Sequence, residues 1–174
     1  MWLRLLTKVT NSLSQGGIAD VIEFQKTHVN EQVRYLGVLG ATEIVPGLSY
    51  DTIIPIRTRE NNTRIDVAAL DRVVDTIKKY HKEGSSVVVF CAAGVERSPL
   101  AVIYYLYKTN ALPLREAYQF YRTRRAILSS IEQDIADIET AEGGRLYHAS
   151  EKSHRRTSKF RNAQVHNPAR KGAK

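Results

Sequence analysis

The hydrophobic positions between residues 50 and 140 follow strand and helix spacings in turn. The apolar run that ends at Phe90 predicts a strand over residues 86–90, of the kind buried on both faces of a parallel sheet. Before it, apolar side chains three and four positions apart predict a helix over residues 66–80, which Gly84 ends. After it, the same spacing predicts helices over residues 99–108, 113–125 and 127–140.

The first 65 residues give a weaker pattern. A mostly apolar stripe predicts a helix over residues 18–37, with a turn at Gly16-Gly17 before it. Short strands are expected at residues 38–39, 43–45 and 51–56, and the charged residues 57–64 have the composition of an exposed loop. Strands that alternate with helices predict a single-domain α/β fold, with a central, mostly parallel sheet and helices on both faces.

Charge changes the picture at the end of the chain. The 174 residues carry a formal net charge of +8. Residues 145–174 hold nine Lys or Arg and one acid, so they account for all of the excess, while residues 1–144 are neutral. We therefore expect one folded domain over residues 1–144 and a basic, disordered tail over residues 145–174. Contact with nucleic acid or another polyanion is expected through this tail, and a solvated tail without a partner is the alternative.

The cysteine count and the apolar runs indicate the cellular compartment. One cysteine excludes an internal disulfide, and no apolar run approaches the roughly 18 residues of a membrane-spanning helix. The short apolar start is not followed by a small-residue cleavage site, which argues against a secretory signal. A cytoplasmic protein without membrane contact is the expectation.

The segment from Cys91 to Ser98 runs from the predicted buried strand into the start of a helix, at the strand end where α/β sheets bind ligands. Successive backbone amides of such a loop, with the free amides of the helix N-terminus, form an anion cradle. Arg97 adds a planar charged fork that matches two phosphate oxygens, and Cys91 is a nucleophile aimed at the bound group. The expected phosphate-binding residues are Ala92, Ala93, Gly94, Val95, Glu96 and Arg97.

The spacing Cys-x5-Arg-Ser resembles the signature of the protein tyrosine phosphatases, specifically the dual-specificity branch. The strand over residues 87–90, the helix over residues 100–106 and the later Arg122-x-x-Arg125 are also similar to this family, so the likeness covers about residues 50–135. The resemblance implies that Cys91 forms a phosphocysteine, that Arg97 binds the phosphate, and that Ser98 helps the thiolate leave in the second step.

The chain departs from the family pattern at two positions. Phe90 stands where the family has a histidine, whose contacts help to shape the loop and favour the thiolate. The family takes a general acid, normally Asp, from about 30 residues upstream, and residues 57–62 contain none. Glu60 is nearest to that place, Asp66 is a second candidate that reads better as a helix N-cap, and a site without an effective acid is the third possibility.

The function expected from this resemblance is hydrolysis of phosphate monoesters without a metal or other cofactor. Phosphorylated proteins are the expected substrates, with phosphotyrosine first and phosphoserine and phosphothreonine second. Two alternatives stay open: a catalytically weak phosphate-binding module, motivated by Phe90 and the missing aspartate, and an RNA 5′-triphosphatase that uses the basic tail.

Overall fold

The computed structural model describes residues 6–29, 31–57, 64–109 and 111–143. The chain divides into two units, Met1–Ile138 and Glu139–Lys174, and the elements of the first unit carry the site. They are β1 (Thr7–Lys8), β2 (Leu13–Gly17), α1 (Ile18–Thr27), β3 (Val33–Gly37), the 3-10 helix η1 (Ala41–Glu43), β4 (Thr52–Ile53), α2 (Val67–Lys82), β5 (Ser86–Cys91), α3 (Arg97–Lys108) and α4 (Leu114–Arg122). Residues 130–143 are also helical.

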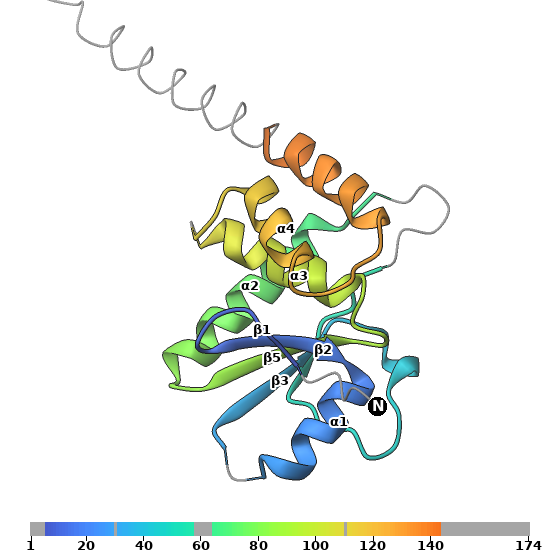
Figure 1. Ribbon diagram of the computed structural model, residues 1–174, viewed down its shortest axis with the longest axis vertical. Coiled ribbons are helices and arrows are strands. Elements are labelled where there is room, and N and C mark those ends of the chain that lie inside the picture. The colour runs from blue at the N-terminus through green and yellow to red at the C-terminus, as the bar shows by residue number, and fades with distance from the viewer. Residues whose placement is uncertain (1–5, 30, 58–63, 110, 144–174) are drawn as a thin grey trace, which may run out of the picture. The chain divides into compact units, whose positions relative to one another are not determined.

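A five-stranded sheet lies at the centre of the first unit, in the order β1-β2-β5-β3-β4. Only β1 and β2 pair antiparallel; the other three pairs are parallel. Helix α1 covers one face of the sheet, and α2, α3 and α4 lie on the other (Figure 1). The predicted α/β fold, with a mostly parallel sheet between helices, is confirmed. No helix of the described residues is both long and apolar enough to cross a membrane.

The central strand and its flanking helices follow the sequence pattern. The predicted strand over residues 86–90 is β5, whose residues from Val87 to Cys91 are all buried. The predicted helix over residues 66–80 is α2, and the side chain of Asp66 caps it by accepting from the amide of Ala69 at 3.1 Å. Helices are also found near residues 99–108, 113–125 and 127–140, with ends that differ from the predicted ones by at most three residues.

The N-terminal elements correct the prediction. The predicted helix over residues 18–37 is too long: α1 ends at Thr27, where the His28 ring stacks on Phe24 at 3.8 Å, and Val33–Gly37 forms β3 beside β5. The predicted strands at residues 38–39 and 43–45 are absent, and Ala41–Glu43 is a 3-10 helix instead. Gly16 and Gly17 end β2 rather than forming a turn.

Two parallel strands bring the site together. The neighbours β2 and β5 end at the same edge of the sheet, with Gly17 beside Cys91, and each strand is followed by a helix. The N-terminus of α1 and the segment between β5 and α3 are therefore adjacent. The backbone amide of Ile18 donates to the carbonyl of Ala92 at 3.1 Å, which joins the two segments directly.

Candidate active site

Cys91 is the last residue of β5 and is only 2% exposed. The preceding residue, Phe90, is completely buried in the hydrophobic core between the sheet and α1, where it packs with Val21 and Leu39. Alternation along the strand separates these two side chains. Phe90 therefore anchors β5 by packing. A histidine at this position would have to find hydrogen-bond partners for its ring nitrogens within the hydrophobic core.

The loop after Cys91 turns its carbonyl groups outward. The carbonyls of three loop residues accept hydrogen bonds of 2.9–3.1 Å from different segments, and the pairs are Ala92 with the Ile18 amide, Gly94 with the Gln15 side chain, and Val95 with the Leu128 amide. The described residues offer no hydrogen-bond partner to the backbone amides of residues 92–97. A loop whose carbonyls are fixed on its outer side presents its amides on the inner side, as anion-binding loops do.

Gly94 is required at the tightest point of this loop. Its φ is +70°, a conformation that disfavours any residue with a side chain. A Cβ atom placed here would also lie 2.5 Å from the backbone nitrogen of Gly17. The loop can therefore lie against the end of β2 only because both neighbouring chains approach through glycines.

Arg97, the first residue of α3, is held by Glu43 of η1. Nη1 and Nη2 of Arg97 donate to the two carboxylate oxygens at 2.6 and 2.7 Å, a bidentate pair. Glu43 is itself fixed by the backbone amide of Gly40, at 2.7 Å. The hydrogen bonds from Arg97 lower the pKa of Glu43, and Glu43 raises the pKa of Arg97.

This pairing leaves one edge of the guanidinium available. A guanidinium has five N–H groups, and Glu43 takes one from each terminal nitrogen. The Nε–H and a remaining N–H then form a second, parallel pair of donors. Glu43 thus fixes the orientation of Arg97 without using the edge that could bind two phosphate oxygens.

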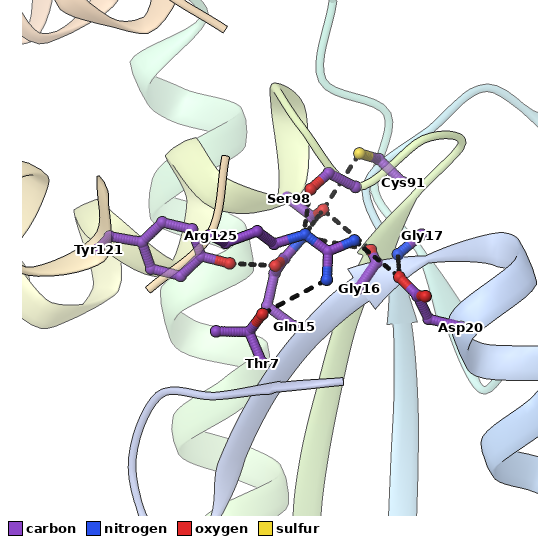
Figure 2. Close-up of polar contacts among 10 residues, drawn as sticks. Thr7, Gln15, Gly16, Gly17, Asp20, Cys91, Ser98, Tyr121 and Arg125 are labelled. Carbon is purple, nitrogen blue, oxygen red and sulfur yellow. Dashed lines mark hydrogen bonds and ion pairs between the residues drawn. The ribbon is translucent and has the colours of Figure 1, made fainter. Parts of the chain in front are cut away.

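Ser98 and Cys91 are brought into contact. The hydroxyl oxygen of Ser98 lies 3.1 Å from Sγ of Cys91 and 3.2 Å from the carbonyl oxygen of Gly16 (Figure 2). Ser98 is completely buried, and among the described residues the remaining polar neighbour of its hydroxyl is the side chain of Gln15, at 2.7 Å. A hydroxyl that can donate to the sulfur is therefore held beside it.

A second arginine, Arg125, links segments at the same edge of the sheet. Arg125 pairs with Asp20 of α1 at 2.7 Å and donates to the hydroxyl of Thr7 at 3.3 Å (Figure 2). Asp20 also accepts from the backbone amide of Gly17, at 2.9 Å. This network ties the region after α4 to the start of α1, and with it the strand end on which the loop rests.

The other predicted residues are placed as follows. Glu96 directs its side chain to Ser130, whose hydroxyl donates to it at 3.2 Å. Asp66 is occupied as the N-cap of α2. Glu60 lies outside the described residues. The described residues contain no group of three or more His, Cys, Asp or Glu side chains that could hold a metal ion.

Sequence reasoning missed four residues that support the loop: Gln15, Asp20, Glu43 and Tyr121. All four come from segments distant from Cys91 in the chain, and no short motif marks them. The one available signal was Gln15, a polar residue between Leu13 and two glycines, in a stretch too short to predict as a strand. Arg125 had been singled out by its likeness to the family's arginine.

Comparison with known proteins identifies relatives. Residues 8–139 match the family model "Dual specificity phosphatase, catalytic domain". Over 71 residues the chain is 35% identical to dual specificity protein phosphatase 5 of Rattus norvegicus and to dual specificity protein phosphatase 1 of Homo sapiens. These matches cover 40% of this chain but only 18% and 19% of the two relatives.

Solved structures share the fold. The crystal structure of human tyrosine phosphatase-like serine/threonine/tyrosine-interacting protein has a TM-score of 0.61 at 17% identity, and the match covers 80% of this chain and 98% of that one. The crystal structure of Tk-PTP in the active form has a TM-score of 0.58 at 18% identity, and the match covers 81% and 97%.

Proposed function

Because the chain belongs to the dual specificity phosphatase catalytic domain family, we propose that it hydrolyses phosphate monoesters through a phosphocysteine on Cys91. The observation that carries the proposal is the environment of the sulfur. Cys91 ends a buried strand, precedes a loop whose amides have no hydrogen-bond partner among the described residues, and contacts the hydroxyl of Ser98 at 3.1 Å. The matched segment spans under a fifth of the two curated relatives, so the proposal concerns the activity of this domain alone.

In the first step the Cys91 thiolate attacks the phosphorus of a bound monoester in line with the leaving oxygen. The amides of residues 92–97 and the free edge of Arg97 hold the three non-bridging oxygens and stabilise the charge that develops on them. The bond from phosphorus to the leaving oxygen breaks as the sulfur–phosphorus bond forms. The leaving oxygen takes a proton from an acid, for which Glu60 is our candidate because Asp66 already caps α2.

In the second step water attacks the phosphocysteine and the sulfur leaves as a thiolate. A donor placed beside the sulfur stabilises this negative charge, and Ser98 is such a donor. No metal ion is invoked at any point. The sequence from Cys91 to Ser98 contains no lysine, which favours singly phosphorylated protein side chains over highly charged substrates. Phosphotyrosine is the proposed first substrate, with phosphoserine and phosphothreonine second.

The proposal is tested with Cys91→Ser. Turnover of an aryl phosphate and of a phosphotyrosine peptide should be lost, because the hydroxyl is a far poorer nucleophile, whereas orthovanadate should still bind to the unchanged amides and Arg97. An active Cys91→Ser protein would reject the covalent mechanism. A wild-type protein that binds orthovanadate but turns over neither substrate would instead be a phosphate-binding module.

A further inference from the structure

Gln15 of β2 is a completely buried amide behind the loop that follows Cys91. Its Nε2 lies 2.7 Å from the hydroxyl oxygen of Ser98, 3.0 Å from the carbonyl oxygen of Gly94 and 3.3 Å from that of Gly16. Its Oε1 accepts a hydrogen bond from the hydroxyl of Tyr121. Four groups that surround the site are thus joined to one side chain (Figure 2).

The neighbours of Gln15 determine which way its amide faces. The carbonyl oxygens of Gly94 and Gly16 can only accept hydrogen bonds, so the NH2 group must point toward them and the oxygen must point toward Tyr121. The reversed amide would set its oxygen against two carbonyl oxygens. Tyr121 must then be the donor in its hydrogen bond with Gln15. Burial raises the pKa of Tyr121, which keeps the phenol protonated and able to donate.

The fixed amide in turn limits what Ser98 can do with its own proton. The NH2 group has two N–H donors, and its two shorter contacts are with the hydroxyl oxygen of Ser98 and the carbonyl oxygen of Gly94. Because one N–H is donated to the hydroxyl oxygen, the Ser98 proton is directed to Sγ of Cys91 or to the carbonyl oxygen of Gly16. While sulfur is bonded to phosphorus it is a weak acceptor, and the carbonyl competes well. When sulfur becomes negative, it is the stronger acceptor of the two.

We propose that Gln15 and Tyr121 are positioning residues that aim the Ser98 hydroxyl at the Cys91 sulfur during breakdown of the phosphocysteine. This inference rests on the proposed function. In that step a water oxygen bonds to phosphorus, the phosphorus–sulfur bond breaks, and its electron pair stays on sulfur. The water's proton passes to the carboxylate that acted as the acid in the first step. The Ser98 proton stays on its oxygen and forms a hydrogen bond to the departing sulfur.

The test uses Gln15→Leu in the full chain, with an aryl phosphate as substrate. Loss of an oriented donor to a developing charge should lower kcat about tenfold, somewhat less than complete removal of such a donor. Since kcat/KM reports steps up to phosphocysteine formation, it should fall by less than kcat, and any fall in kcat/KM reports the lost donor to the Gly94 carbonyl of the loop. Phosphoenzyme breakdown becomes rate-limiting, so a burst of released aryl alcohol should appear in the first turnover.

Two further variants separate positioning from folding. Gln15→Leu combined with Tyr121→Phe removes both members of the Gln15–Tyr121 hydrogen bond, so the phenol is not left unpaired and part of the stability returns, yet the double variant should keep the low kcat and the burst. Tyr80→Phe is the matched control: Tyr80 of α2 bonds Thr52 of the edge strand β4, which β3 separates from β5, so its loss should leave the kinetics unchanged. In a Ser98→Ala background, Gln15→Leu should add less than about a twofold further fall in kcat.

Three results would each overturn the positioning role. Gln15→Leu could lower kcat and kcat/KM equally, it could lower neither, or it could keep its full effect on kcat in the Ser98→Ala background. Those outcomes leave the proposed function intact if Cys91→Ser is inactive. An active Cys91→Ser protein would instead overturn the covalent mechanism and this inference together.

Discussion

Glu43→Gln removes the carboxylate that orients Arg97 and leaves a side chain of the same shape. The wild-type pair makes two charge-assisted hydrogen bonds of 2.6 and 2.7 Å, and the Arg97 side chain is 13% exposed. Bonds to charged groups contribute about 1.5–3 kcal/mol when buried, and exposed ion pairs contribute about 0.2–1 kcal/mol. Glu43 is 34% exposed, so we place the loss between these ranges, at about 1–2 kcal/mol.

If that loss falls on transition-state binding by Arg97, kcat/KM should drop by about 5- to 30-fold, since about 1.4 kcal/mol corresponds to a factor of ten. The assay is steady-state hydrolysis of an aryl phosphate at pH 7, with thermal unfolding followed in parallel. Asp51→Asn is the control, because it weakens another arginine–carboxylate pair, with Arg34 of β3 at 2.9 Å, which makes one hydrogen bond in place of two and has a more exposed arginine. A Glu43→Gln protein within twofold of wild type, or matched by Asp51→Asn, would refute the orienting role of Glu43.

The other predictions concern the loop, pH, the acid and the tail. Gly94→Ala should lower the free energy of unfolding by about 2 kcal/mol or more, measured by urea unfolding, because it adds a strained φ and a backbone clash; an unchanged midpoint would contradict the loop geometry. The lowered pKa of Glu43 means that its ion pair stabilises the fold above the ordinary glutamate pKa of about 4.3 and is lost as the pH falls through the lowered value. The stability difference between wild type and Glu43→Gln should therefore shrink in that window, and a constant difference would be the contrary result. Glu60→Gln should slow hydrolysis of phosphotyrosine about 10²-fold, and it should slow hydrolysis of aryl phosphates with acidic leaving groups much less. Asp66→Asn should change stability and not turnover, and the reverse pattern would make Asp66 the acid. Deleting residues 145–174 should leave aryl phosphate turnover unchanged and weaken retention on a polyanion column; lost turnover would place the tail in the catalytic domain.

The centre of the fold could be predicted because its sequence signals are local. The run from Val87 to Cys91 has too few polar residues for any exposed element, and Asp66 and Gly84 mark the ends of α2 by their own chemistry. The N-terminal half lacked such marks. Val33 and Leu36 continue the apolar spacing of α1, and only their pairing with β5 makes them a strand. That pairing is a tertiary contact, and it overrides helical periodicity.

The residues of the candidate site also divide into those with a local sequence signal and those without one. Cys91, Arg97 and Ser98 lie within eight consecutive residues, so spacing alone reveals them. Glu43 and Gln15 approach this segment from other strands and turns, and their roles depend on where the sheet places them. A glutamate three residues after a glycine, or a glutamine in a short strand, carries no signal until the opposing side chain is known.

The central claim is that phosphate passes through Cys91, and trapping the phosphoenzyme tests it most directly. The Ser98→Ala protein, which lacks the donor beside the sulfur, would be mixed with an aryl phosphate and quenched in acid within the first turnover. We expect the mass of one phosphoryl group on the peptide that contains Cys91, decaying on further incubation. Hydrolysis by a protein that carries no phosphoryl group on Cys91 during turnover would contradict the account.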